Sequence, residues 1–136
     1  MDEIQPDLII FGGDNSAHNI YDNTSEEVTE YTIKVSDMLK DAVKGRDITV
    51  LPILGNHDVF VETIQSFDAP HDNPEINGFM DHWSEFISPE ALDKFSEYGY
   101  YSTPIQLANG KGVPEGSRAL VINSNVCANI NWFLYG

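Results

Sequence analysis

Two short apolar runs, each followed by a polar segment that begins with glycine, mark the first half of the chain. Residues 8–11 (Leu-Ile-Ile-Phe) lie between Pro6 and a pair of glycines. Residues 48–54 form the second run, which ends abruptly at the sequence Gly-Asn-His-Asp of residues 55–58. Apolar runs of this length, bounded by residues that break regular structure, are typical of buried strands. We therefore expect one strand over 8–11 and another over 48–54.

The segment between these runs has the pattern of a helix. Thr24-Ser25-Glu26-Glu27 has the form of a capping box, with Thr24 as N-cap and Glu27 at N3. Gly45 stands where a C-terminal cap is expected. Apolar residues follow the box at helical spacing: Val28, Tyr31, Val35, Met38, Leu39 and Ala42. The order strand, helix, strand predicts a βαβ unit with a parallel pair.

The predicted topology brings two distant polar segments together. The carboxyl ends of parallel strands lie side by side at one edge of a sheet. Gly13-Asp14 follows the first strand, and Gly55-Asn56-His57 follows the second. We expect the two segments to face each other.

The remainder of the chain is predicted to continue this α/β pattern with further helices and strands. Residues 60–77 are predicted to be irregular, and 78–86 to be helical. Ser88 as N-cap and Pro89 at N1 predict a further helix. Strands are expected over 98–103 and 119–123, joined by the turn-rich segment 109–112. The length of 136 residues suits one domain or part of one, and no internal boundary is visible.

Composition and charge exclude several functional classes. The chain has 22 acidic and 7 basic residues, which gives a formal net charge of −15. This charge argues against binding nucleic acid, which requires a basic face, and against electrostatic docking on anionic lipid. Most of the carboxylates are expected to be solvated, although some can serve cations. No apolar run is long enough for a transmembrane helix, and the acidic residues 1–3 do not begin a signal peptide.

Three polar residues after the strands have the right chemistry for a metal-dependent site. Two glycines before Asp14 let the backbone turn sharply and expose the carboxylate, which can bridge two metal ions. The side-chain oxygen of Asn56 is a neutral metal ligand, and His57 can act as a general acid. Each motif alone is most often a simple turn. Their expected meeting at one sheet edge favours a site.

The motifs resemble those of the calcineurin-like metallophosphoesterases. "GGD" followed by "GNHD" is similar to the two metal-binding blocks that this superfamily carries on successive strands. The stretch "LIIFGGDNSAHN" is similar to the Gly-Asp-x-x-x-His segment of acid sphingomyelinase-like phosphodiesterases. "YGYYSTP" and "LVINSNVCANINWFLY" resemble later strands of the same group. The resemblance extends from Asp7 to Tyr135 and implies part of a layered β-sandwich flanked by helices.

The resemblance implies a role for each matched residue. Asp14 would be the carboxylate that bridges the metals, and Asn56 would ligate one metal and help to position the phosphate. His57 would protonate the leaving oxygen or stabilise the transition state, and His18 would line the site near the leaving group. The cofactors would be two divalent ions, with zinc the expected metal. A hydroxide would then attack a phosphodiester such as sphingomyelin, or a nucleotide or pyrophosphate analogue.

Two blocks of the superfamily pattern are not found in this chain. They are the upstream Asp-x-His block and the downstream Gly-His-x-His block. His71 and His82 lie in neither motif, and we expect them to be an ordinary loop residue and an ordinary helix-surface residue. We therefore expect residues 1–136 to be part of a larger phosphoesterase catalytic domain. The alternative function is an incomplete or inactive chain, such as a truncated product or a domain kept for binding. This chain would then bind metal weakly and catalyse nothing on its own.

The same resemblance bears on processing and location. Relatives are secreted or lysosomal, although this chain carries no signal peptide. Asn23-Thr24-Ser25 is a glycosylation sequon, a triplet that is also common by chance. Cys127 is the single cysteine and forms no internal disulfide. The resemblance implies that Cys127 pairs with a cysteine outside this chain, and the alternative is a buried free thiol.

Overall fold

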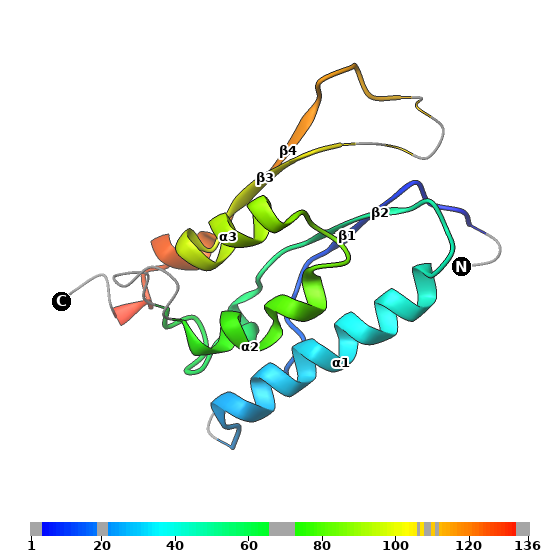
Figure 1. Ribbon diagram of the computed structural model, residues 1–136. Coiled ribbons are helices and arrows are strands. Elements are labelled where there is room, and N and C mark those ends of the chain that lie inside the picture. The colour runs from blue at the N-terminus through cyan, green and yellow to red at the C-terminus, as the bar shows by residue number, and fades with distance from the viewer. Residues whose placement is uncertain are drawn as a thin grey trace.

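The βαβ unit predicted from the sequence forms the first part of the molecule. The computed structural model describes residues 4–18, 22–65, 73–105, 107, 110 and 112–132. Strands β1 (Leu8–Phe11) and β2 (Thr49–Pro52) are parallel, and helix α1 (Ser25–Val43) joins them (Figure 1). The strand is shorter than the predicted 48–54, because its partner β1 ends at Phe11, which pairs with Pro52. One further backbone bond, from the N–H of Ile53 to the carbonyl of Phe11, closes the pair at 2.7 Å.

Helix α1 begins as predicted and buries polar as well as apolar side chains. The Thr24 hydroxyl accepts from the backbone N–H of Glu27 at 3.2 Å, and the Glu27 carboxylate accepts from that of Thr24 at 2.8 Å. Gly45 follows the helix with a φ of +72°. The buried residues of α1 are Val28, Thr32 and Ser36, whereas Tyr31 and Met38 of the apolar set are exposed. Thr32 and Ser36 are buried because their hydroxyls have hydrogen-bond partners in other elements.

The second helix differs from its predicted bounds, and the third agrees. Helix α2 (Pro74–Trp83) starts before the predicted residue 78, because the side chain of Asn73 caps it by accepting from Ile76 at 3.0 Å. It ends before the predicted residue 86, and turns continue to that residue. Helix α3 (Pro89–Tyr98) begins at the predicted cap, where Ser88 accepts from Ala91 at 3.3 Å.

A two-stranded antiparallel ribbon follows the helices. It consists of β3 (Tyr101–Pro104) and β4 (Arg118–Val121) and extends away from the helices in Figure 1. The strand predicted over 98–103 begins later, because α3 continues through Tyr98 and Gly99 ends it with a left-handed backbone. The strand predicted over 119–123 is shifted to β4. The predicted turn over 109–112 lies partly outside the described residues, and His71 lies outside them as well.

Aromatic residues of α2, α3 and β3 form the core and fix the ribbon to the βαβ unit. The rings of Phe79 and Phe95 lie 4.9 Å and 5.0 Å from that of Trp83 between centroids, and all three side chains are fully buried. The hydroxyl of Tyr101 donates to the carbonyl of Pro52 at 2.8 Å, which ties β3 to the end of β2. The predicted α/β class is confirmed, and the small sheets with their helices fit the expected architecture.

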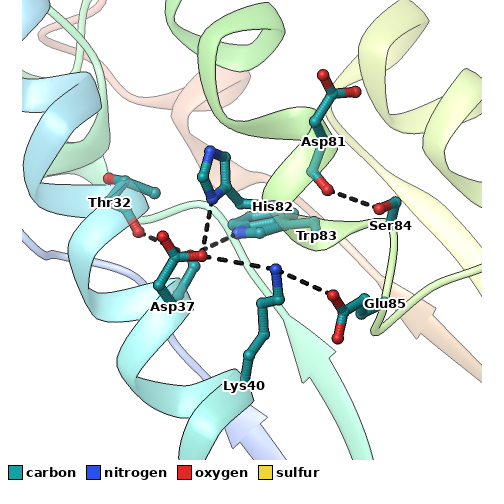
Figure 2. A network of polar contacts seen from close by, with 9 residues as sticks. Thr32, Asp37, Lys40, Asp81, His82, Trp83, Ser84 and Glu85 are labelled. Carbon is teal, nitrogen blue, oxygen red and sulfur yellow. Dashed lines mark hydrogen bonds and ion pairs between the residues drawn. The ribbon is translucent and has the colours of Figure 1, made fainter.

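Polar contacts between α1 and α2 set the position of the long helix (Figure 2). The indole N–H of Trp83 donates to the Ser36 hydroxyl at 3.0 Å, and that hydroxyl donates to the Thr32 carbonyl at 2.7 Å. The His82 ring and the Asp37 carboxylate lie 2.8 Å apart, and this hydrogen bond holds the pKa of Asp37 below its usual value. His82 is thus the helix-surface residue that we predicted. No helix in the described part of the chain is long and apolar enough to cross a membrane.

Candidate active site

The loops after β1 and β2 meet at one edge of the parallel pair. The Oδ1 atom of Asp14 accepts a hydrogen bond from the backbone N–H of His57 at 3.1 Å. His57 lies in a short 3₁₀ turn, η1 (Asn56–Asp58), which follows β2. The expected juxtaposition of Gly13-Asp14 with Gly55-Asn56-His57 is therefore what the structure shows.

Glycines allow this close approach. A Cβ atom on Gly13 would overlap the carboxylate of Asp58 and the backbone nitrogen of Gly55, and one on Gly55 would overlap the carboxylate of Asp14. Gly13 and Asp14 also have φ values of +72° and +59°. Asp is among the few residues that tolerate this left-handed region. The sharp turn presents the Asp14 side chain to solvent, as the sequence predicted.

A buried carboxylate, that of Asp58, holds the two loops and α1 together. Its Oδ2 atom accepts from the backbone N–H groups of Asp14 at 2.9 Å and Gly55 at 2.8 Å. Its Oδ1 atom accepts from the backbone and side chain of Asn15 at 3.0 Å and 2.8 Å, and from the Thr32 hydroxyl at 3.1 Å. The side chain is 1% exposed, so these donors replace water as partners of the charge. We did not predict this positioning role, although Asp58 follows His57 in the same motif.

The two histidines singled out from the sequence lie against each other. The rings of His18 and His57 meet edge to face with centroids 4.2 Å apart. His57 is 6% exposed, and the Ser16 hydroxyl donates to its carbonyl at 2.6 Å. The loop after β1 thus brings His18 to the buried imidazole, with its own ring exposed to solvent.

Glu62 joins this group and was missing from our predictions. Its Oε1 atom lies 2.9 Å from the Asn56 side-chain nitrogen, which donates to it, and 3.3 Å from Nε2 of His57. Glu62 lies outside any motif that we recognised, and only its contacts reveal it. It fixes the orientation of the Asn56 amide.

Buried amide side chains contact the loop after β2 and hold it in place. The Asn125 side chain donates to the carbonyl of Gly55 at 3.2 Å. The Asn131 side chain donates to the carbonyls of Asn125 at 3.1 Å and Gln65 at 2.9 Å. This network connects the segment after β4 to the site. Asn125 and Asn131 belong to the late stretch whose likeness to phosphodiesterases we noted.

Two residues named for processing lie away from these contacts. Cys127 ends the 3₁₀ turn η2 (Ser124–Cys127) and is exposed, so the buried thiol considered as an alternative is wrong. Asn23 precedes the cap of α1 and is partly exposed. The roles of both remain predictions.

The residues present suit a divalent cation. The carboxylate of Asp14 and the amide oxygen of Asn56 are hard oxygen ligands on adjoining loops. Among the described residues, only the N–H of His57 hydrogen-bonds to the Asp14 carboxylate, and it uses Oδ1. Oδ2 of Asp14 therefore has no hydrogen-bond partner among the described residues and is available to a metal ion. Asp14 and Asn56 alone would supply only part of the coordination shell of such a cation.

Several known proteins are similar to this chain in sequence. The chain is 28% identical over 130 residues to sphingomyelin phosphodiesterase B of Dictyostelium discoideum, covering 94% of this chain and 19% of that protein. It is 26% identical over 141 residues to sphingomyelin phosphodiesterase 2 of Caenorhabditis elegans, covering 95% and 20%. An endopolyphosphatase of Cryptococcus neoformans is 28% identical over 102 residues, covering 73% and 14%. The chain thus spans a fifth or less of the length of these relatives.

A family profile covers nearly the whole chain. The profile described as calcineurin-like phosphoesterase matches residues 1–127, which include both loops of the site and the beginning of the segment after β4. The chain therefore belongs to the calcineurin-like phosphoesterases, a family of hydrolases that use divalent metal ions.

Proposed function

We propose that the protein hydrolyses phosphodiesters at the edge where the loops after β1 and β2 meet. The observation that carries this proposal is the hydrogen bond between Asp14 Oδ1 and the N–H of His57. It joins the exposed carboxylate of Asp14 to the backbone of His57, so a candidate metal ligand and a candidate general acid lie on adjoining loops.

Asp14 and Asn56 are the proposed metal ligands. A divalent cation bound there would offset charge on the phosphate oxygens and lower the pKa of water. The Asp14 carboxylate is accessible and has one oxygen available, and Glu62 orients the Asn56 amide through a bond of 2.9 Å. Two ions, with zinc as the metal, remain part of the proposal because the family uses divalent metals.

His57 and His18 are the proposed proton donors. Cleavage of a phosphodiester leaves an alkoxide, which departs far more easily when a general acid protonates it. The edge-to-face contact of the rings, at 4.2 Å, puts both imidazoles at the same place in the site. The burial of His57 fixes its ring, and the exposure of His18 gives it access to substrate.

Sphingomyelin is the substrate that the charge of the chain favours. The printed names of the relatives include sphingomyelin phosphodiesterases and endopolyphosphatases. A polyphosphate carries one or more negative charges on every unit and would be repelled by a chain of net charge −15. The zwitterionic headgroup of sphingomyelin has no net charge. Nucleotide and pyrophosphate analogues remain alternatives that a substrate panel separates.

The test compares two conservative variants with a surface control. Asp14→Asn is expected to lower both bound metal and hydrolysis of bis(p-nitrophenyl) phosphate, because it removes the ligand charge. His57→Gln is expected to retain metal at Asp14 and to lower turnover about 10²–10⁴-fold. Asp41→Asn, an exposed change on α1, should match the parent. Equal loss of the Asp14 metal in both site variants would contradict the assignment of His57.

The alternative is that these 136 residues have no turnover of their own. The ligand count favours it, since Asp14 and Asn56 are the two matched metal ligands and a dinuclear catalytic site needs several ligands per ion. In the same assay, a parent rate equal to that of Asp14→Asn would support this alternative. A rate above it, abolished by a chelator, would reject it.

Location and processing complete the proposal. A secreted or lysosomal protein would carry a glycan on Asn23 and a disulfide from Cys127 to a cysteine outside this chain. The exposure of Cys127 allows such a bond. Mass spectrometry of the protein from its native source, before and after deglycosylation and reduction, tests both modifications.

A further inference from the structure

We propose that His18, His57 and Glu62 form a zinc-binding site separate from Asp14 and Asn56. One ligand atom from each of the three side chains lies within 4.8 Å of the others. Two imidazoles and one carboxylate are a ligand set that binds zinc in proteins and leaves a fourth position open.

The spacing of the ligand atoms fits a tetrahedral ion. Bonds of about 2.0–2.1 Å at tetrahedral angles put two ligand atoms ~3.3 Å apart. Nε2 of His57 and Oε1 of Glu62 are 3.3 Å apart. The third ligand, from His18, lies on an exposed loop residue, and a small movement of that side chain would complete the set.

The surroundings of His57 support a ligand. The side chains of His57 and Glu62 are 6% and 20% exposed, so water screens their interaction with a cation only weakly. Nδ1 of His57 is buried, and no described residue hydrogen-bonds to it. When Nε2 binds the ion, Nδ1 carries the ring proton, and it has no acceptor among the described residues. The Glu62 carboxylate, by contrast, is anchored by the Asn56 amide, an outer contact that holds a ligand in place.

Occupation of this site would inhibit the proposed reaction. A ring nitrogen whose lone pair is bound to zinc cannot carry a proton to a leaving group. Zinc at His18, His57 and Glu62 would therefore remove both proposed acids while Asp14 and Asn56 keep their own metal. This consequence rests on the proposed function, whereas the binding site itself does not.

Cobalt titration of the full 136-residue chain tests the site, because tetrahedral Co²⁺ absorbs strongly in the visible range. Glu62→Gln and His18→Gln are each expected to weaken the binding that gives this absorption at least 10-fold. His82→Gln is the matched control, since it alters a histidine 2.8 Å from a carboxylate on the α1–α2 surface. His82→Gln and Asp14→Asn should both keep the absorption.

Two results would overturn the proposal. One is that Glu62→Gln binds cobalt as tightly as His82→Gln, which would leave Glu62 as a hydrogen-bond partner only. The other is that Asp14→Asn abolishes the absorption, which would assign the metal to the Asp14 site. Circular dichroism confirms that each variant is folded. Failure of the proposed function would appear differently, as absence of hydrolysis even at metal concentrations too low to give the cobalt absorption, where the inhibiting site is empty.

Discussion

The carboxylate of Asp58 is expected to contribute a large share of the stability of the βαβ unit. Asp58→Asn keeps the size and shape of the side chain but replaces one acceptor oxygen with an NH₂ group. If that group takes the Oδ2 position, it faces the N–H donors of Asp14 and Gly55. If it takes the Oδ1 position, it faces the donors of Asn15 and Thr32. In either orientation at least two hydrogen bonds are lost.

The magnitude follows from the type of bond. A hydrogen bond to a charged group contributes about 1.5–3 kcal/mol, so two of them amount to about 3–6 kcal/mol. Burial prevents water from replacing the lost partner, since Asp58 is 1% exposed. A domain of this size has a total free energy of unfolding of about 5–15 kcal/mol. The substitution should therefore remove a large part of it.

Urea unfolding followed by circular dichroism measures this loss. Asp58→Asn should lower the midpoint strongly with little change in the slope of free energy against urea, which reports the surface exposed. Asp41→Asn makes the same chemical change on an exposed part of α1 and should leave the midpoint unchanged. A loss below about 1 kcal/mol for Asp58→Asn would refute the view that its carboxylate joins the loops.

Three further predictions use the same measurement. Gly13→Ala and Gly45→Ala both place a side chain at a φ of +72°, but only the new methyl group at position 13 meets other atoms. Gly45→Ala should lower the free energy of unfolding by about 1–2 kcal/mol, and Gly13→Ala by clearly more. Equal losses of stability would contradict the close approach of the two loops at Gly13. Ser36→Ala leaves the buried N–H of Trp83 without its acceptor and should cost about 1–3 kcal/mol, whereas Ser84→Ala on the surface should cost little. Burial raises the pKa of the Tyr101 hydroxyl, so above about pH 10 the unfolded chain releases this proton before the folded one does. The free energy of unfolding of the parent should then fall by up to about 1.4 kcal/mol per pH unit. Tyr101→Phe should lack this part of the fall, and identical pH profiles of the two proteins would exclude the effect.

Local signals made the first half of the fold predictable from the sequence. The capping box of Thr24 and Glu27 involves residues three apart, and glycines mark the ends of both strands. The same kind of signal was overlooked at the start of α2, where Asn73-Pro74 repeats the cap-and-proline pattern recognised at Ser88-Pro89. That error came from treating residues 60–77 as one irregular segment.

The candidate site was predictable only as far as its motifs. Asp14, Asn56 and His57 follow strands whose parallel pairing fixes where they meet. The contacts of Asp58 with Asn15 and Thr32 join residues 43 and 26 positions apart, and no periodicity encodes them. The burial of Thr32 and Ser36 was missed for the same reason, since Asp58 and Trp83, which bond to their hydroxyls, lie 26 and 47 positions away. Glu62 has no motif, and its role rests on geometry alone.

The bonds to Asp58 also have a consequence for the order of folding. They close loops between β1, α1 and β2, and loop closure of this kind must wait until distant segments have met. The site is therefore expected to form among the last parts of this unit, after α1 has docked. In a newly made chain, the apolar strands would then be exposed early in folding, and the site would be assembled at the end. Under the proposed function, partly folded molecules would be inert toward phosphodiesters, and hydrolysis would report the fraction of molecules that have completed folding.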